Sequence, residues 1–258
     1  MSERNIMKNP IPFVLLFASL FITACTSGQE PNPRLSLFIG VDISGSYINS
    51  GDFDNSLNFL SKYIYAHLNG VDELEKPNVL YISSIGGAKD DEPKTFFPIQ
   101  TFEHKSIAEI EEKLHEIFPA EKQNPYTDFN AFFEQIALTI RNKNLILRPV
   151  SIVMLSDGVP DIKKDGVTDF RSINLSTLEK LSRNITLRLL YTDASTGRNW
   201  QTQVPRRRVK VWTQDSEVMK SWNDSTIFIP NKPFNEQDRF ISWIKDNVDF
   251  GVRARRVD

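Results

Sequence analysis

A short stretch near residue 42 places oxygen-bearing side chains directly after an apolar run. The run Leu35 to Val41 leads into Asp42, and Ser44 and Ser46 follow at alternate positions. An apolar run of this length predicts a buried strand. Carboxylates and hydroxyls are the ligands of hard cations such as Mg²⁺, Mn²⁺ or Ca²⁺, whereas zinc prefers nitrogen and sulfur. The stretch therefore indicates a divalent cation site or, alternatively, a turn that Asp and Ser merely cap.

Two later segments carry side chains of the same kind. Thr127 and Asp128 open a predicted helix, and Asp157 follows the almost entirely apolar strand 150–155. In a parallel sheet the carboxyl ends of the strands meet at one edge, so we expect all three segments to converge there. Such convergence favours a cation site over three separate caps. The three histidines have no metal-ligand spacing and are expected on the surface or in the core.

Strands and helices alternate along most of the chain. Apolar runs predict strands at 35–41, 79–85, 150–155, 185–191 and 209–213, with a further edge strand within 95–102. Helical spacing predicts helices at 55–69 after an Asp54 cap, 107–117 after a Ser106–Glu109 capping box, 127–140, 175–181, 217–222 and 235–248. The pattern predicts a doubly wound α/β domain over 34–250, with a mostly parallel, Rossmann-like sheet flanked by helices. The polar connection 192–208 is long enough to hold extra structure.

The stretch "DISGS", Asp42 to Ser46, resembles the D-x-S-x-S motif of the von Willebrand factor type A (VWA) domain. In that family the motif is the first part of a metal-ion-dependent adhesion site. Thr127 in "YTDFNAFF" matches the threonine of the second part, and Asp157 in "MLSDG" matches the aspartate of the third. The resemblance covers roughly residues 34–190 and implies a VWA fold.

The resemblance also implies a role for each matched residue. The hydroxyls of Ser44 and Ser46 would bind the cation directly, and the hydroxyl of Thr127 would bind it directly or through water. Asp42 and Asp157 would act mainly through bound water and orient the hydroxyls, and Asp128 is a further candidate for that role. Because the direct ligands are neutral, the cation would keep its attraction for an anionic oxygen. A protein partner offering an Asp or Glu carboxylate would then complete the site.

The first 24 residues read as a signal peptide. Ile11 to Ala24 is apolar apart from two hydroxyl residues, which suits the h-region of a leader and is short for a membrane span. "ITAC", Ile22 to Cys25, resembles the lipobox of bacterial lipoproteins, and Cys25 is the only cysteine. The resemblance implies a lipid-modified Cys25 on a tether, 25–33, anchored in a membrane by several acyl chains. We expect a place in the bacterial cell envelope; because Thr26 rather than aspartate follows the cysteine, the outer membrane facing the periplasm is favoured in a Gram-negative source.

The charge of the chain offers no sign of nucleic-acid binding, since the formal net charge is −2. Basic residues do cluster at 206–210 and at 253–256, the latter within a C-terminal tail, 251–258. A solvated face is the simplest interpretation of these clusters. The alternative, more specific interpretation is contact with anionic lipid headgroups or an acidic partner.

The combined pattern predicts a lipid-anchored, metal-dependent binding module rather than an enzyme. The alternative is a Mg²⁺-dependent hydrolase or phosphate-handling enzyme that uses the same acidic site. The sequence contains no Gly-rich phosphate loop, no G-x-S-x-G elbow, and no histidine placed to activate Ser44 or Ser46.

Overall fold

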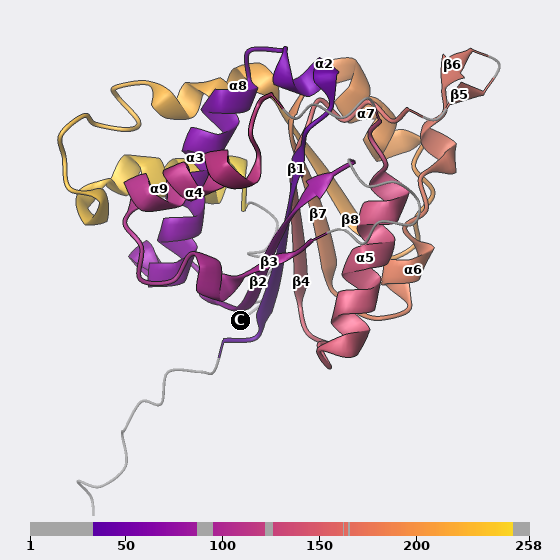
Figure 1. The fold of residues 1–258 in the computed structure, drawn as a ribbon, viewed down its shortest axis with the longest axis horizontal. Coiled ribbons are helices and arrows are strands. Elements are labelled where there is room, and N and C mark those ends of the chain that lie inside the picture. The colour runs from indigo at the N-terminus through magenta and orange to yellow at the C-terminus, as the bar shows by residue number, and fades with distance from the viewer. Residues whose placement is uncertain (1–32, 87–94, 122–125, 162, 165, 250–258) are drawn as a thin grey trace, which may run out of the picture. The chain divides into compact units, whose positions relative to one another are not determined.

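A six-stranded, mostly parallel sheet forms the centre of the protein in the computed structural model (Figure 1). The structure describes residues 33–86, 95–121, 126–161, 163–164 (backbone only) and 166–249. The strands lie in the order β3-β2-β1-β4-β7-β8, with only β3 antiparallel to its neighbour. Their bounds are Leu35–Asp42 (β1), Pro77–Ile85 (β2), Phe97–Pro98 (β3), Val150–Leu155 (β4), Ile185–Thr192 (β7) and Lys210–Asp215 (β8). A separate two-stranded ribbon pairs β5 (Lys163–Lys164) with β6 (Val167–Thr168).

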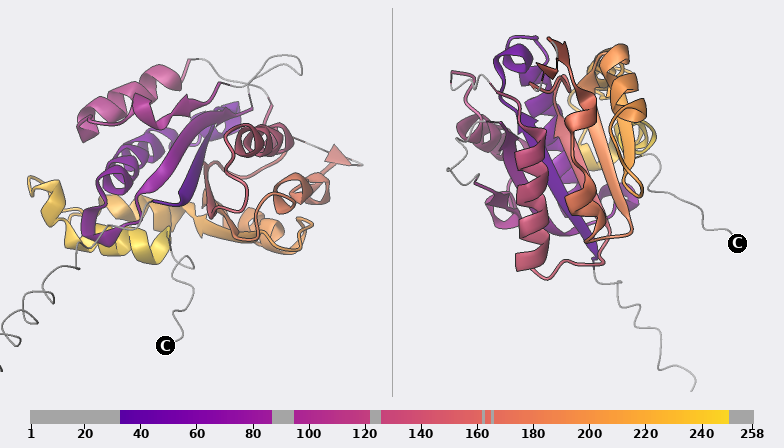
Figure 2. Two further views of the ribbon diagram at one scale, coloured as in Figure 1. Left: turned by 90° about the horizontal axis from the view of Figure 1, so that it is seen from below. Right: turned by 90° about the vertical axis from the view of Figure 1, so that its right-hand side faces the viewer.

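Helices cover both faces of the sheet. Their bounds are Gly45–Ile48 (α2), Phe53–Asn69 (α3), Ile107–Ile117 (α4), Phe129–Asn142 (α5), Ser176–Glu179 (α6), Ala194–Thr202 (α7), Ser216–Lys220 (α8) and Asp238–Asn247 (α9). Figures 1 and 2 show α3, α4 and α9 on one face of the sheet and α5 and α6 on the other. This arrangement confirms the predicted doubly wound α/β class.

The two faces of the sheet bury two separate hydrophobic clusters. Leu37, Ile39 and Val41 of β1 pack into the cluster on the α3 side, while Phe38 packs into the cluster on the α5 side. Successive side chains of a strand point to opposite faces, so an uninterrupted apolar run such as β1 serves both clusters at once. The same requirement explains why β4, in the middle of the sheet, is buried along its whole length.

Most of the predicted elements are present, with differences at their ends. The capping box of Ser106 and Glu109 is formed, and Gly70 ends α3 in the left-handed conformation. The predicted cap Asp54 is wrong, because α3 already begins at Phe53 and Asp52 occupies the cap position. The edge strand shrinks to two residues that include Pro98, which cannot donate a backbone hydrogen bond to a neighbouring strand.

Two helices were not individually predicted. α7 occupies the polar connection 192–208, where we expected extra structure without its type. α2 is a single turn that begins directly after Ser44 and so shapes the candidate motif itself. The predicted helix 175–181 is reduced to the four residues of α6.

The leader, Cys25, most of the tether and the C-terminal tail lie outside the described residues. The described residues belong to one compact unit that begins at Pro33. No helix among them is long and apolar enough to cross a membrane.

Candidate functional site

Strand register brings the candidate segments to one edge of the sheet. Val41 pairs with Leu155 of β4, and Asp42 pairs with Ile85 of β2. The residues that follow these three strands are therefore neighbours across the edge, although they are far apart in the sequence. The carboxyl ends of parallel strands are where ligands bind in open α/β sheets.

Asp42 is fully buried at this edge and is held by two donors. Its Oδ1 accepts a hydrogen bond from the backbone N–H of Ser44 at 2.8 Å, and its Oδ2 accepts one from the Ser156 hydroxyl at 2.5 Å. Both oxygens are thus occupied by protein groups. This geometry suits a carboxylate that organises the loop and acts on a cation from a distance, as the resemblance implies.

The surroundings of Asp42 shift its protonation. Burial raises the pKa of the Asp42 carboxyl to about 6; the hydrogen bonds from Ser156 and Ser44 act in the opposite direction, and the charge of Asp157 adds to the rise. Burial dominates because an ionised carboxylate loses its hydration inside the protein. A nearby cation would favour the ionised form again.

The two motif serines present their hydroxyls side by side. The Oγ atoms of Ser44 and Ser46 lie 3.1 Å apart. Ser44 also caps α2, accepting a hydrogen bond from the backbone N–H of Tyr47 at 3.4 Å, and is buried, whereas Ser46 is exposed. The capping explanation is therefore correct for Ser44, but it does not account for the position of Ser46.

Thr127 is held at the same edge by the turn after β2. Gly86 has a φ of +86°, and a Cβ atom there would overlap the carbonyl oxygen of Tyr126. α5 approaches β1 just as closely, since a Cβ atom on Gly40 would lie 2.6 Å from the ring of Phe132. The close approach of both segments places the buried Thr127 beside the strand ends.

Asp157 lies in a turn that α7 holds in place. Its Oδ1 accepts the backbone N–H of Val159 at 3.0 Å, and the next residue, Gly158, has a φ of +78°. The Gly158 N–H donates to the Ser156 hydroxyl at 2.9 Å, and its carbonyl accepts the indole N–H of Trp200 at 2.7 Å. The Ser156 hydroxyl thus connects this turn directly to the carboxylate of Asp42.

Asp128 has a different role from that of the other candidates. Its Oδ1 accepts the backbone N–H of Ala131 at 2.9 Å, which caps α5. The side chain is exposed, and its described hydrogen bond is the one expected of a helix cap.

Sequence reasoning missed two residues that build the site, Gly86 and Asp161, and placed Ser156 at the strand end without assigning it a role. Asp161 accepts a hydrogen bond from the backbone N–H of Thr127. Ser156 directly precedes Asp157 and ends an apolar strand, so its position in sequence was a usable signal. For Asp161 and Gly86 the sequence offers no such signal, because their partners are distant in the chain.

The candidate donors for a hard cation are three hydroxyls and one carboxylate. No cluster of three or more His, Cys, Asp or Glu side chains in the described part of the chain could hold a metal ion. The oxygens of Ser44, Ser46 and Thr127, with the half-buried carboxylate of Asp157, are the candidate ligands. Hydroxyl and carboxylate oxygens fit Mg²⁺, Mn²⁺ or Ca²⁺.

A second charged cluster lies between α3, β7 and the end of α9. The Asp249 carboxylate accepts a hydrogen bond from the Tyr63 hydroxyl at 3.0 Å and contacts His67 Nε2 at 3.0 Å and Arg188 Nε at 3.9 Å. Burial lowers the pKa of His67, but the Asp249 carboxylate outweighs it, and the net pKa is raised. Burial raises the pKa of Asp249, but the charge of His67 outweighs it, and the net pKa is lowered. The cluster ties three elements together inside the fold.

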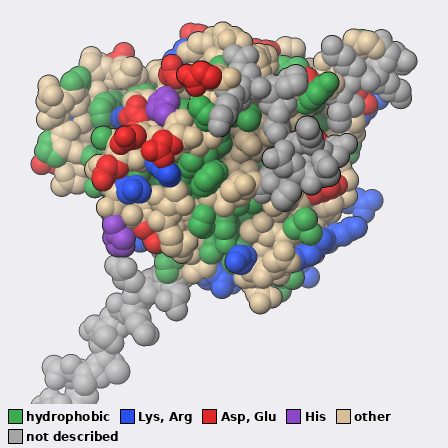
Figure 3. Space-filling model, viewed as in Figure 1, with side chains coloured by type: hydrophobic (Ala, Val, Ile, Leu, Met, Phe, Trp, Pro, Cys, Tyr) green, Lys and Arg blue, Asp and Glu red, His purple; other side chains and the backbone are tan. Residues whose placement is uncertain are grey.

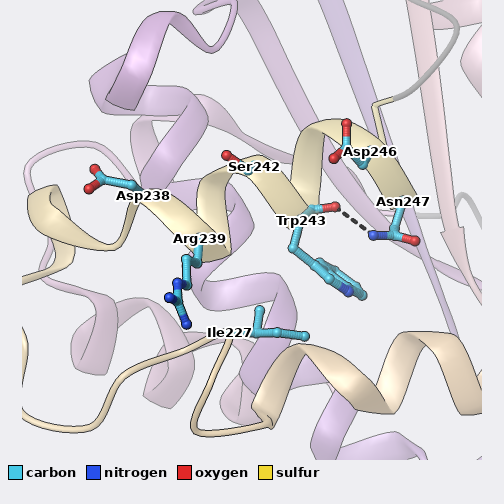
Figure 4. A pocket seen from close by; sticks show the side chains of 7 residues that line it. All are labelled: Ile227, Asp238, Arg239, Ser242, Trp243, Asp246 and Asn247. Carbon is cyan, nitrogen blue, oxygen red and sulfur yellow. Dashed lines mark hydrogen bonds between the residues drawn. The ribbon is translucent and has the colours of Figure 1, made fainter.

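A shallow pocket of about 360 Å³ on the surface of α9 contains none of the predicted site residues (Figure 4). Ile227 and side chains of α9 line it. The Trp243 indole at its wall is largely buried and donates to the Ser221 hydroxyl at 3.1 Å. That indole is therefore part of the packing rather than a free stacking surface.

Comparison with known proteins finds similarity only among solved structures. Neither a protein-family model nor a curated protein matches the chain. The alignment with proximal thread matrix protein 1 from the mussel byssus covers 73% of this chain and 44% of the mussel chain, at 14% identity and a TM-score of 0.44. The alignment with the manganese-loaded TRAP protein of Plasmodium vivax covers 79% of this chain and 74% of the TRAP chain, at 19% identity and a TM-score of 0.46. The alignment with the SpRpn10 VWA domain covers 71% of this chain and 89% of the SpRpn10 chain, at 15% identity and a TM-score of 0.37.

This chain thus spans less than half the length of the mussel protein. At such identities each likeness concerns the fold alone.

Proposed function

We propose that this chain is a divalent-metal-dependent protein-binding module of the VWA type, anchored by lipid to a bacterial cell envelope. The observation that carries the metal site is the pair of hydroxyls of Ser44 and Ser46, 3.1 Å apart, above the buried carboxylate of Asp42. The 2.5 Å hydrogen bond from Ser156 fixes that carboxylate from the neighbouring strand. A simple turn would not require a buried acid with both oxygens held in this way.

The residues at this edge of the sheet would bind a cation in different roles. Ser44, Ser46 and Thr127 would supply hydroxyl oxygens, Asp157 would act directly or through water, and Asp42 would orient the motif. The cation would supply positive charge that neutral ligands leave largely uncompensated. A glutamate or aspartate carboxylate of a protein partner is the chemical group that such a site would attract.

The lipid anchor is a separate part of the proposal and rests on the lipobox-like sequence ending at Cys25. The described residues from Pro33 form one compact unit with two hydrophobic clusters of its own, so the domain is tested without its first 25 residues. Expression with palmitate labelling tests the anchor, with Cys25→Ser as the control. Incorporation of label into the Cys25→Ser chain would contradict the assignment of the lipidated residue.

Calorimetric titration of residues 26–258 with Mg²⁺, Mn²⁺ and Ca²⁺ tests the metal site. We expect saturable binding of at least one of these ions and its loss in Ser46→Ala, since Ser46 is exposed and its removal leaves the core intact. Ser225→Ala is the matched control, because Ser225 is also an exposed serine. Absence of binding in the parent protein would exclude the metal site.

The enzymatic alternative is tested on the same preparation. Metal-dependent hydrolysis of p-nitrophenyl phosphate that is lost in Ser46→Ala would favour a phosphate-handling enzyme over a binding module. Crosslinking in intact envelopes, with and without a chelator, then identifies a protein partner whose capture depends on the metal.

A further inference from the structure

The amino ends of the parallel strands form an edge that is rich in cations. The starts of β1, β4, β7 and β8 lie in register, since Ser36 pairs with Val150 and Val150 with Ile185, while Thr186 pairs with Lys210. The three loops that precede β4, β7 and β8 therefore lie next to one another. Backbone hydrogen bonds join the loops before β4 and β7 directly, from Val150 to Asn184 at 2.9 Å and from Leu147 to Leu181 at 3.1 Å.

These loops, 143–149, 180–184 and 203–209, and the first residue of β8, Lys210, include no acidic residue. Their exposed or half-exposed cations are Lys143, Arg148, Lys180, Arg183, Arg206, Arg207, Arg208 and Lys210. We call this set the basic edge. The nearby carboxylate of Glu179 accepts backbone N–H groups of Arg207 and Arg208 at 2.5 and 2.7 Å. Figure 3 shows Lys and Arg side chains gathered at the lower right of the molecule, below and beside α5 and α6.

Two aliphatic side chains protrude from the basic edge. Ile146 is 48% exposed and Leu147 is 71% exposed. Leu147 has a φ of +69°, a left-handed backbone that a leucine adopts only at a cost. Its backbone N–H is bonded to Leu181, so the strained conformation is held by the neighbouring loop and keeps the side chain in solvent. Aliphatic side chains surrounded by cations are typical of a surface that meets a lipid interface.

The sequence upstream of β1 joins the protein at this same edge. β1 starts at Leu35, and the Ser36 N–H donates to the carbonyl of Pro149 at 2.9 Å, beside the Ile146–Leu147 tip. Leu35 is ten positions after Cys25, and a chain of that length can span at most about 35 Å. A lipid on Cys25 would therefore hold the basic edge close to the bilayer. Asp42 lies at the far end of β1, roughly 25 Å away along the strand.

We propose that the basic edge and the Ile146–Leu147 tip bind an anionic phospholipid surface. The cations contact headgroup phosphates, and the two aliphatic side chains enter the interface between headgroups and acyl chains. This orientation directs the candidate metal site away from the membrane, toward a partner. The biological context rests on the proposed lipid anchor, but the surface itself can be tested without it.

Vesicle flotation of residues 26–258, which lack Cys25, provides the test. The vesicles are phosphatidylglycerol and phosphatidylethanolamine in a 30:70 ratio, with pure phosphatidylcholine as the neutral comparison. We expect binding to the anionic vesicles only, weakened in 0.5 M salt because exposed charges are screened. Lys143→Gln with Arg183→Gln should weaken binding about 25-fold, or about fivefold per cation. Arg198→Gln with Lys232→Gln, which removes two cations outside the basic edge, should leave it unchanged.

The apolar tip is tested by Leu147→Gly. Glycine adopts a φ of +69° without strain, so this variant should fold at least as well as the parent, and thermal melting confirms it. We expect vesicle binding to weaken roughly tenfold, as removal of an inserted leucine implies. Val167→Ala is the control, because Val167 is 70% exposed on the small β5–β6 ribbon.

The outcomes separate this proposal from its competitors. Absence of binding to anionic vesicles overturns it. Binding that depends on the cations but not on Leu147, and that equals binding to duplex DNA or heparin at the same salt, also overturns it in favour of a nonspecific polyanion site. Vesicle binding should be insensitive to a chelator, and Leu147→Gly should bind metal normally. The membrane surface and the metal site can therefore fail independently.

Discussion

The hydroxyl of Ser156 donates a 2.5 Å hydrogen bond to the carboxylate of Asp42, joining residues 114 positions apart at the ends of adjacent strands. This bond links two of the three segments that the sequence singled out. It also leaves Asp42 buried as a group whose charge is costly without a compensating cation. The following predictions derive from that relationship and from the contacts around it.

Asp42→Asn should stabilise the metal-free protein at neutral pH. Burial raises the pKa of Asp42 from 3.8 to about 6, so the folded state binds a proton more tightly than the unfolded state does. The free energy of unfolding then falls as the pH rises from about 4 to 6, by up to about 3 kcal/mol. Asparagine removes this pH dependence, and urea denaturation at pH 4.5 and pH 7.5 measures it. An equal stability difference at both pH values would contradict the prediction.

The same substitution should weaken cation binding about 10- to 100-fold, the range typical of residues that orient metal ligands. Calorimetry with Mg²⁺ and Mn²⁺ measures the change. Asp54→Asn is the control, because Asp54 is exposed in the first turn of α3 and is not one of the candidate site residues. Unchanged affinity in Asp42→Asn would remove Asp42 from the site.

Gly86→Ala should displace Thr127 and reduce cation affinity. A Cβ atom at Gly86 overlaps the carbonyl oxygen of Tyr126, so the backbone before Thr127 must move. Gly166→Ala is a matched control, because Gly166 has a similar φ of +80° and nothing within 4 Å of its Cβ position. Both variants should lose about 1 kcal/mol of stability from backbone strain, whereas only Gly86→Ala should lose metal binding. Parallel thermal melts and calorimetry separate the two effects.

Trp200→Phe should loosen the turn that carries Asp157. The substitution removes the 2.7 Å hydrogen bond from the indole to the carbonyl of Gly158 and leaves that carbonyl buried without its donor. We expect a loss of about 1–3 kcal/mol in the free energy of unfolding. Metal affinity should fall as well, because the turn is no longer held beside Ser156. A variant that loses stability but binds metal as tightly as the parent would show that the turn keeps its position without α7.

Asp249→Asn should destabilise the protein most strongly between about pH 4 and 6.5. The raised pKa of His67 contributes stability that is present below its unfolded value and lost as the pH rises through the folded value. The lowered pKa of Asp249 contributes stability that is lost as the pH falls through its folded value. Breaking a buried pair of this kind costs about 3–5 kcal/mol. Denaturation at pH 5.5 and pH 9 measures the difference.

The control for that experiment is Asp246→Asn, which removes an exposed acid of α9 three residues before Asp249. It should change stability by less than about 0.5 kcal/mol at either pH. A pH-independent loss in Asp249→Asn would assign the stabilisation to the contact of Asp249 with Arg188 rather than with His67.

The elements themselves were largely readable from the sequence. Unbroken apolar runs at β1 and β4 identified strands covered on both faces, and the capping box at Ser106 marked the start of α4. Spacing also singled out Asp42, Ser44 and Ser46, because a local motif depends on neighbours in the chain. α7 was not predicted because its nine residues are mostly polar; its Asp193 cap and its contacts with β8 and Gly158 favour a helix there.

Tertiary structure alone decided which residues meet. The sequence by itself determined the class of fold and the oxygen-rich chemistry of the strand ends. It could not place Asp161 at the backbone of Thr127, Gly86 against Tyr126, or Ser156 at the carboxylate of Asp42. It equally could not align three separate cationic loops beside Leu147. These contacts join distant residues through the register of parallel strands, and register is set by packing of the whole sheet rather than by any local pattern.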